Sequence, residues 1–518
     1  MTALEVALTP AGGGPLSGTE VKDAPGHIRG SSLMLAGRTL SMSITFVTQM
    51  LTVRYLSKED FGAFAYALSM VALVQSVLAL GLDRSDTRFL CLYDEQCDAR
   101  RFRGVLVTEL ACILSLGALA VITVVLGRDL IDPNATSGAV PLLVVLIVLA
   151  PLQALDGLVL NVFASLAQAR AVFFRRYLLD PLLRLLVVTA VVLAAGDVHE
   201  IAGGYVLGAL IGVGFYGCLL VRLLRRSPLL AGSRGVTLGA RELLVFSIPL
   251  LSGNVAYVMT TTFGALLLGH LRDDSAVAAF RAVQPVAALN TMVMLSFAVL
   301  FTPAASRLHA RADDRALREL YGVTTAWLAV LTWPVFLVTT LLAEPLTTTL
   351  FGQRYAGSGR LLAILAVGYY FSASLGCNGL LLQVLGDVRW VVAGNVLTLV
   401  CAVAGGIVLV SAYGATGAAL SAAGALVVRN VFNQVGLQRH AQTAGFERRY
   451  LRVYGVLAAA AAAVTLAQHL VRPPLPVAVA VVLLAAVAVA RLVRGELRIA
   501  ETFPEVGRLP VVGRLFAA

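Results

Sequence analysis

Two arginines lie inside long apolar stretches of this chain, where they are candidates for binding an anion. Arg38 falls within a stretch that begins at Ser31, and Arg281 lies just inside another. Because a charge at a bilayer centre costs roughly 2.5–3.5 kcal/mol, an arginine there should face a water-filled cavity. The guanidinium group is planar and binds phosphate in a fork geometry that lysine cannot copy. Since Lys22 and Lys58 are the two lysines of the chain, any phosphate ligands within the apolar stretches would be arginines.

Each of these arginines also has a simpler interpretation. Arg38 could extend its side chain to the nearer headgroups, as long basic side chains do near helix ends. Arg281 could serve as an anchor at the outer interface. Arg429, in a later apolar stretch, is interpreted as a helix-end residue and not as a cavity ligand.

The acidic residues within the apolar stretches could hold a coupling cation or pair with arginines. Asp180 and Arg184 are spaced i, i+4, which places them on one helix face where they can form an ion pair. Pro181, beside Asp180, predicts a bend. Asp156 and Glu109 are the other carboxylates of the N-terminal half, each suited to Na⁺ or H⁺ binding or to a structural pair.

Neutral polar side chains within the same stretches could line a path for a hydrated ligand. Such residues also join helices to one another by hydrogen bonds, so the pattern alone does not separate the two roles. The residues concerned are Asn254, Gln284, Asn290, Asn378 and Gln383.

These residues must be positioned by membrane-spanning helices. The chain of 518 residues is 58% hydrophobic and only 13% charged, about half the charge of a soluble protein. A helical span needs about 20 apolar residues, and about fourteen stretches approach or exceed that length. They are 31–55, 61–82, 104–126, 139–165, 176–195, 201–222, 243–269, 276–303, 322–343, 359–385, 390–412, 415–437, 451–470 and 475–493.

The basic residues predict the orientation. With the N-terminus in the cytoplasm, the cytoplasmic gaps hold 22 Arg and the outer gaps only 7 Arg and Lys. This positive-inside bias predicts an even number of spans with both termini cytoplasmic. The net charge of +11 mostly reflects this bias, so we expect no nucleic-acid partner. The six scattered cysteines predict no metal or disulfide site.

The chain also repeats itself at an offset of about 215 residues. Ile201–Tyr205 matches Ala415–Ala419, and Leu166–Arg170 falls opposite Leu382–Gly386. Parallel repeats of this kind are typical of transporters that work by alternating access. The predicted organisation is a disordered cytoplasmic tail (1–30), an N-lobe of six spans (31–225), a cytoplasmic linker (226–242), a C-lobe of six spans (243–437), two appended spans (451–493) and a cytoplasmic tail (494–518).

Several short motifs resemble those of a known family. They are RYLSKEDFGAF at Arg54–Phe64, Leu80–Leu82, the Gly-rich segment at Ile201–Tyr205 and the turn Tyr413–Gly417. Together they resemble the polysaccharide (O-antigen or exopolysaccharide) flippases of the multidrug/oligosaccharidyl-lipid/polysaccharide exporter superfamily, relatives of the lipid II flippases. The resemblance covers roughly residues 31–493.

The resemblance implies an all-α polytopic protein of about fourteen spans, forming a V-shaped bundle of two six-helix lobes plus two C-terminal helices. It implies a cargo, a polyprenyl-diphosphate-linked glycan flipped across the bacterial inner membrane for surface polysaccharide assembly. We also expect a monomer in the bilayer, with polysaccharide polymerase and export machinery as partners. No cofactor is expected, and Na⁺, H⁺ or the membrane potential could supply the driving force.

Two alternatives remain. One is a multidrug cation antiporter of the same superfamily, which the intramembrane arginines disfavour. The other is a membrane glycosyltransferase or polymerase, which would need a sizeable outer loop. Neither lysine stands in a phosphate loop, because Asp23 and Glu59 follow them, and neither HExxH nor GxSxG occurs. The sequence therefore predicts a transporter and not an enzyme.

Overall fold

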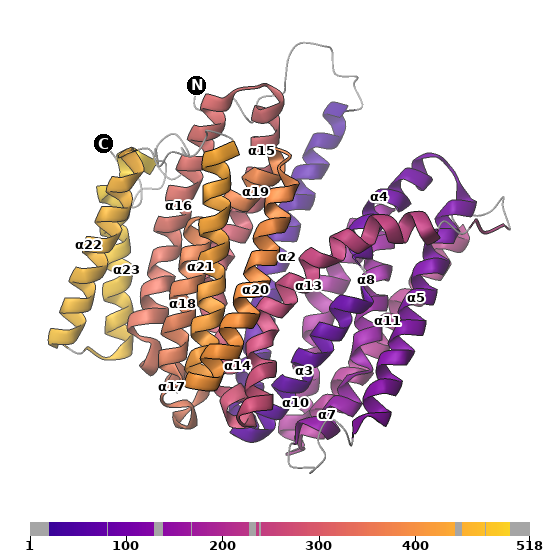
Figure 1. Cartoon of the computed structure of the whole chain (residues 1–518), viewed down its shortest axis with the longest axis horizontal. Helices are drawn as coiled ribbons and strands as arrows, with labels where there is room; N and C mark the ends of the chain where they lie inside the picture. Colours follow the sequence, from indigo (N-terminus) through magenta and orange to yellow (C-terminus); the bar gives the residue numbers. More distant parts are fainter. Residues whose placement is uncertain are drawn as a thin grey trace. The chain divides into compact units, whose positions relative to one another are not determined.

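The computed structural model describes residues 20–79, 81–128, 138–166, 168–226, 235–237, 240–440, 448–471 and 473–497. Over these ranges the chain is helical and contains no strand (Figure 1). It forms two compact units, which we call the N-terminal unit (15–282) and the C-terminal unit (283–518). The all-α fold expected from the sequence is confirmed.

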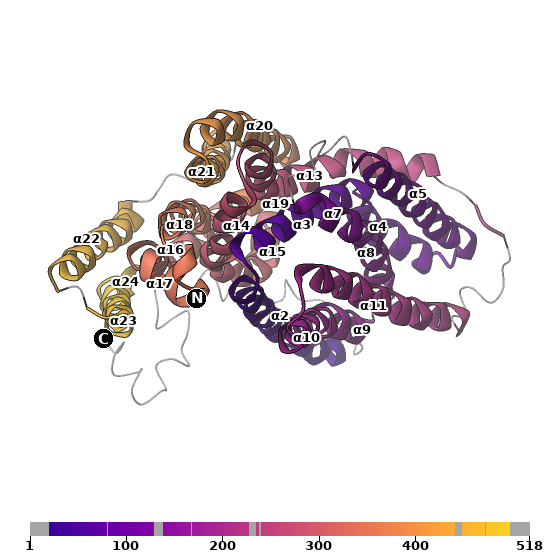
Figure 2. The same ribbon diagram turned by 90° about the horizontal axis from the view of Figure 1, so that it is seen from below.

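Among the described residues, the N-terminal unit contains eleven helical segments and the start of α14. They are α2 (Glu20–Tyr55), α3 (Lys58–Leu78), α4 (Leu82–Glu95), α5 (Ala99–Leu126), α7 (Ala139–Leu146), α8 (Leu149–Ser165), α9 (Ala169–Phe173), the π-helix η1 (Phe174–Leu179), α10 (Asp180–Leu193), α11 (Val198–Arg226), α13 (Ala240–Leu271) and α14 (Asp274–Ala288). The view from below shows α2, α3, α7, α8, α10 and α11 arranged around the middle of this unit (Figure 2).

The C-terminal unit begins within α14 and continues to the end of the chain. Its segments are η2 (Leu289–Thr291), α15 (Met292–Ala310), α16 (Asp314–Leu341), α17 (Ala343–Phe351), η3 (Gln353–Tyr355), α18 (Gly359–Ser374), α19 (Cys377–Val384), α20 (Val388–Tyr413), α21 (Ala415–His440), α22 (Arg448–Val471), α23 (Leu475–Leu492) and α24 (Arg494–Leu497). Its core includes Trp327 and Trp333 of α16, which pack with residues of α22 and α23.

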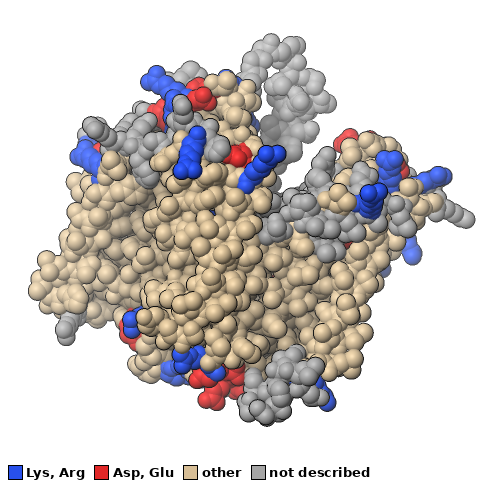
Figure 3. Space-filling view, in the orientation of Figure 1, with Lys and Arg blue, Asp and Glu red and all other residues tan. Residues whose placement is uncertain are grey.

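Every predicted span coincides with one to three of these helical segments. Among the described residues, eleven segments are long and apolar enough to cross a membrane. The predicted spans 31–55, 176–195 and 243–269, which are not among the eleven, correspond to α2, η1 with α10, and α13. On the face seen in Figure 3, the charged side chains of each unit gather near the helix ends, with an uncharged band between them. This is the surface of a multi-pass membrane protein.

The predicted lobes and tails compare with the structure as follows. Helix α2 begins at Glu20, before the predicted first span, because a helix satisfies its own backbone and can extend beyond the apolar stretch. Residues 1–19 and 498–518 of the predicted tails lie outside the described residues, as does most of the linker. Helix starts recur at the predicted offset, since 274 − 58 = 216 for α14 and α3. The two six-span lobes stay a prediction.

The segment Arg54–Phe64 has a structural explanation. Ser57 caps α3, because its Oγ accepts a hydrogen bond from the Asp60 backbone N–H at 3.0 Å. Phe61 and Phe64 are buried. A Cβ added to Gly62 would lie only 1.8 Å from the Asp274 carbonyl oxygen, so glycine is required where α14 begins against α3. The motif therefore shapes a helix start and a close helix contact.

Candidate functional site

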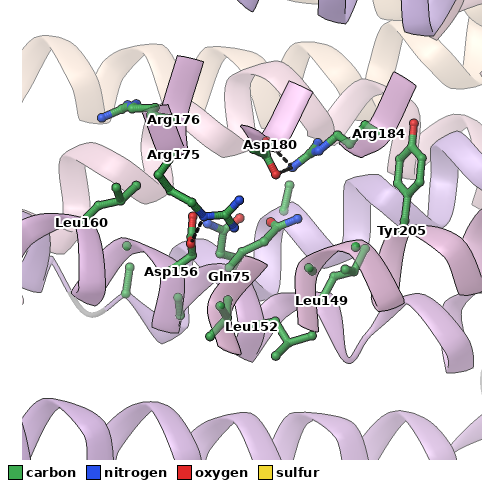
Figure 4. A pocket seen from close by; sticks show the side chains of 18 of the residues that line it. Gln75, Leu149, Leu152, Asp156, Leu160, Arg175, Arg176, Asp180, Arg184 and Tyr205 are labelled. Carbon is green, nitrogen blue, oxygen red and sulfur yellow. Dashed lines mark hydrogen bonds and ion pairs between the residues drawn. The ribbon is translucent and has the colours of Figure 1, made fainter. Parts of the chain in front are cut away.

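The N-terminal unit encloses a cavity of about 630 Å³. Residues from α3, α8, η1, α10, α11 and α13 line it (Figure 4). Most of its polar side chains come from α3, α8, η1 and α10. Ligand cavities in proteins commonly measure 300–1,000 Å³, so this one can hold a sizeable molecule. Its polar lining residues are Gln75, Ser76, Gln153, Asp156, Asn161, Arg175, Arg176, Asp180, Arg184, Tyr205 and Asn254.

A buried ion pair joins two helical segments at the cavity wall. The Nε of Arg175, on η1, donates to Oδ1 of Asp156, on α8, at 2.7 Å. The Arg175 side chain is 3% exposed and the Asp156 side chain 20% exposed. Removing one partner of such a pair leaves an uncompensated charge, which is far more costly than losing a surface pair. This pair therefore fixes the position of η1 against α8.

A second ion pair lies on α10, the helix that follows η1. Nη2 of Arg184 lies 3.2 Å from Oδ2 of Asp180, on the same helix α10. The structure thus places these two residues in the i, i+4 pair that their spacing allows. The Arg184 guanidinium also lies over the Tyr205 ring, 5.9 Å from its centroid. Both charged side chains are more than a third exposed, so they are available to a ligand in the cavity.

The π-helix η1 explains why Arg175 lies inside the unit. Pro181 lacks the N–H that an α-helix would supply to the carbonyl of Tyr177, four residues earlier. The wider π-turn over Phe174–Leu179 precedes this position. It leaves Arg175 buried while its neighbour Arg176 is exposed and also lines the cavity. Single π-turns of this kind are frequent at functional sites.

The cavity gathers four of the residues singled out from the sequence. Asp156, Asp180, Arg184 and Asn254 all line it. Arg38, on α2, is half-buried and is not among the lining residues.

The other predicted residues lie elsewhere. The Arg281 guanidinium donates to the Ser69 hydroxyl of α3, and the Arg281 carbonyl accepts from Gln49 Nε2 at 3.3 Å. Glu109 is buried on α5, away from the cavity lining. In the C-terminal unit, Gln284 is buried, and Asn290 donates to Thr339 Oγ1 at 3.2 Å.

The most important residues that the sequence reasoning missed are Arg175 and Arg176. In the sequence they lie where a predicted cytoplasmic gap meets the predicted span 176–195, and they contribute to the positive-inside bias. One signal could have found Arg176, because residues 176, 180 and 184 recur every four positions and share a helix face. Nothing in the sequence distinguishes Arg175, since its burial depends on the π-turn. In the described part of the chain, no cluster of three His, Cys, Asp or Glu side chains could hold a metal ion.

Solved structures with this fold are membrane transporters. A lipid II flippase, MurJ, in an inward closed conformation matches with a TM-score of 0.70 at 12% identity, covering 90% of this chain and 99% of that one. An inward-facing multidrug resistance MATE family transporter of the MOP superfamily matches with a TM-score of 0.65 at 15% identity, covering 78% and 96%. A MOP superfamily transporter from Pyrococcus furiosus matches with a TM-score of 0.54 at 16% identity, covering 79% and 93%.

Sequence comparison assigns the family. No curated protein matches this chain significantly. The MatE family model matches residues 249–408. The model of the family described as polysaccharide biosynthesis protein matches residues 28–309, more than half of the chain, including the whole lining of the cavity. The chain has the fold of these MOP superfamily transporters, and it belongs to the polysaccharide biosynthesis protein family.

Proposed function

We propose that this chain is a flippase that moves a polyprenyl-diphosphate-linked oligosaccharide from the inner to the outer leaflet of a bacterial inner membrane. The observation that carries the proposal is the cavity itself. Three arginines and two aspartates line it, an excess of one positive charge (3 − 2 = 1) among apolar helices. Such an environment suits an anionic cargo.

The chemistry of the cavity fits a diphosphate. Arg176 and Arg184 present exposed guanidinium groups, which bind phosphate oxygens through short charge-assisted hydrogen bonds. Gln75, Asn161 and Asn254 are amides of the kind that bind sugar hydroxyls. A cavity of about 630 Å³ would hold the diphosphate and the adjacent sugars, with the polyprenyl tail left in the lipid.

The comparisons support the same cargo class. The matching family is one of polysaccharide biosynthesis, and the MurJ structure with this fold is named a lipid II flippase. We further propose a position with both termini in the cytoplasm, following the bias of the basic residues. The membrane potential could drive the anion outward, since one charge moved across 100 mV contributes about 2.3 kcal/mol.

The test is made in cells of the source organism. The gene is deleted, and surface polysaccharide and inner-leaflet polyprenyl-linked glycan are measured together. We expect the polymer to disappear while the lipid-linked unit accumulates inside. Unchanged glycan with new sensitivity to cationic compounds would contradict the proposal and favour the drug antiporter. Loss of polymer with elongation of glycan blocked, and no accumulation inside, would indicate a glycosyltransferase.

A further inference from the structure

The Arg175 guanidinium has a buried donor that its ion pair with Asp156 does not use. Its Nε donates to Asp156, yet its Nη1 is buried and has no hydrogen-bond partner among the described residues. Buried donors are almost always satisfied, and an exception calls for an explanation. A phosphate oxygen is the kind of acceptor that this donor lacks.

Helix α11 leaves space for the guanidinium at Gly212. A Cβ added to Gly212 would lie 2.6 Å from Nη2, 2.7 Å from Nη1 and 2.8 Å from Cζ of Arg175. These distances are too short for a real methyl group. Because the atoms belong to the end of a flexible side chain, an added methyl group would displace the guanidinium and leave the backbone in place. Gly212 itself is buried.

One turn further along α11, an aromatic ring completes the surroundings. The Cζ of Arg175 lies 5.8 Å from the centroid of the Tyr216 ring, within the range of a cation–π interaction. Phe163 of α8 packs edge-on against Tyr216 at 6.0 Å, which holds the ring in place. Gly212 and Tyr216 are spaced i, i+4 and so face the same side of α11.

We propose that Gly212 and Tyr216 are positioning residues for phosphate binding. Together they form a seat on α11 that holds the Arg175 guanidinium beside Asp156 at the cavity wall, ready to bind a phosphate group of the cargo. The role in cargo binding rests on the proposed function, whereas the placement of the guanidinium does not. A side chain at position 212 would displace the Arg175 guanidinium and weaken binding of diphosphates.

The first experiment tests the placement without any ligand. Gly212→Ala is compared with Gly214→Ala, a matched control on the same helix where an added Cβ meets nothing within 4 Å. Each is made in the wild-type and the Arg175→Met background, and thermal unfolding is measured in detergent. We expect Gly212→Ala to lower the unfolding temperature by a few degrees only when Arg175 is present. The four proteins form a double-mutant cycle, which isolates the contact between position 212 and the Arg175 side chain. An equal effect in both backgrounds would overturn the proposal.

The second experiment measures a quantity that a purely structural role would leave unchanged. Binding of farnesyl diphosphate to the purified full-length protein is titrated for the wild type and both glycine variants. We expect Gly212→Ala to weaken binding roughly tenfold, the loss of one charge-assisted hydrogen bond, and Gly214→Ala to change it less than about twofold. Wild-type affinity in Gly212→Ala would overturn the role of the seat. If the wild type does not bind the probe while the coupling in the first experiment persists, the proposed cargo is wrong and the placement stands.

Discussion

The two units differ at two positions that the predicted repeat relates to each other. With an offset of 216 residues, the prediction pairs Asp156 of α8 with Ser372 of α18 (372 − 156 = 216). In the N-terminal unit, Arg175 meets the carboxylate of Asp156 at 2.7 Å. In the C-terminal unit, Arg429 donates from Nη2 to the Ser372 hydroxyl at 3.2 Å. Each of these two residues thus contacts a guanidinium group. The partner is a carboxylate in the N-terminal unit and a hydroxyl in the C-terminal unit, and the two arginines come from η1 and α21.

The two units also differ in the polar side chains that their helices bury. The C-terminal unit has a buried cluster of amides, in which Asn378 Nδ2 donates to the Asn430 carbonyl at 3.0 Å and Asn433 Nδ2 contacts Asn378 Oδ1 at 3.5 Å. Neutral amides of this kind join helices without a net charge. The N-terminal unit instead retains charged groups around a cavity. Under the proposed function, the N-terminal unit binds the ligand and the amide cluster packs helices together.

The largest effect is expected at the buried ion pair. Arg175→Met would leave the Asp156 carboxylate uncompensated and destabilise the protein by about 3 kcal/mol. The double variant with Asp156→Leu should recover most of this loss, because the charge is then removed as well. Unfolding of purified protein measures both, with Arg170→Met, an exposed residue of α9, as the control. No recovery in the double variant would contradict the account.

A smaller effect is expected in the amide cluster. Asn378→Ala would remove a donor to Asn430 and leave Asn433 Nδ2 without its partner, at a cost of about 2 kcal/mol. Surface polysaccharide should stay normal wherever the variant protein is present at wild-type levels. Defective export at normal protein level would show that the C-terminal unit also contacts the cargo.

Ser372→Ala should have a weaker effect still. One hydrogen bond is lost, from the Arg429 guanidinium to a neutral acceptor, which costs about 1.5 kcal/mol. The informative comparison is Asp156→Ser, which gives α8 the side chain that α18 has at the position paired with it by the predicted repeat. We expect this variant to lose export while Ser372→Ala retains it, as read from surface polysaccharide. Equal behaviour of the two variants would remove the distinction between the units.

The smallest effect on stability is expected at Asp180. Its pair with Arg184 is more than a third exposed on both sides, so Asp180→Asn should change stability by less than about 0.5 kcal/mol. The substitution also removes a negative charge from the cavity, which leaves the lining arginines in larger excess and should tighten binding of farnesyl diphosphate. Titration at two salt concentrations checks this, since the gain should shrink as salt screens it. Weaker binding would indicate that Asp180 itself orients the cargo.

The sequence predicted much of the fold for simple physical reasons. Apolar length fixes where a helix can cross a bilayer, and Ser57 shows how a polar residue at a break becomes a helix cap. The fourteen predicted spans therefore coincide with helices. The predicted start at residue 31 was less accurate, because polar residues can extend a helix beyond the membrane.

The site could be predicted only in part. The pair of Asp180 and Arg184 could be predicted because it is local, within one helix. Arg175 was not, because its burial depends on a π-turn and on the space that Gly212 leaves on a different helix. Arg281 was chosen for its charge and position, whereas its hydrogen bond to Ser69 depends on how α14 packs against α3.

The most direct test of the central claim compares the two units in one strain. The deletion strain is complemented with wild type, with Arg175→Met/Asp156→Leu, or with Asn378→Ala, at matched protein levels. Inner-leaflet polyprenyl-linked glycan is then measured. The account predicts that this glycan accumulates in the double variant and not in Asn378→Ala. Normal glycan in the double variant would contradict the claim that the cavity of the N-terminal unit binds the cargo.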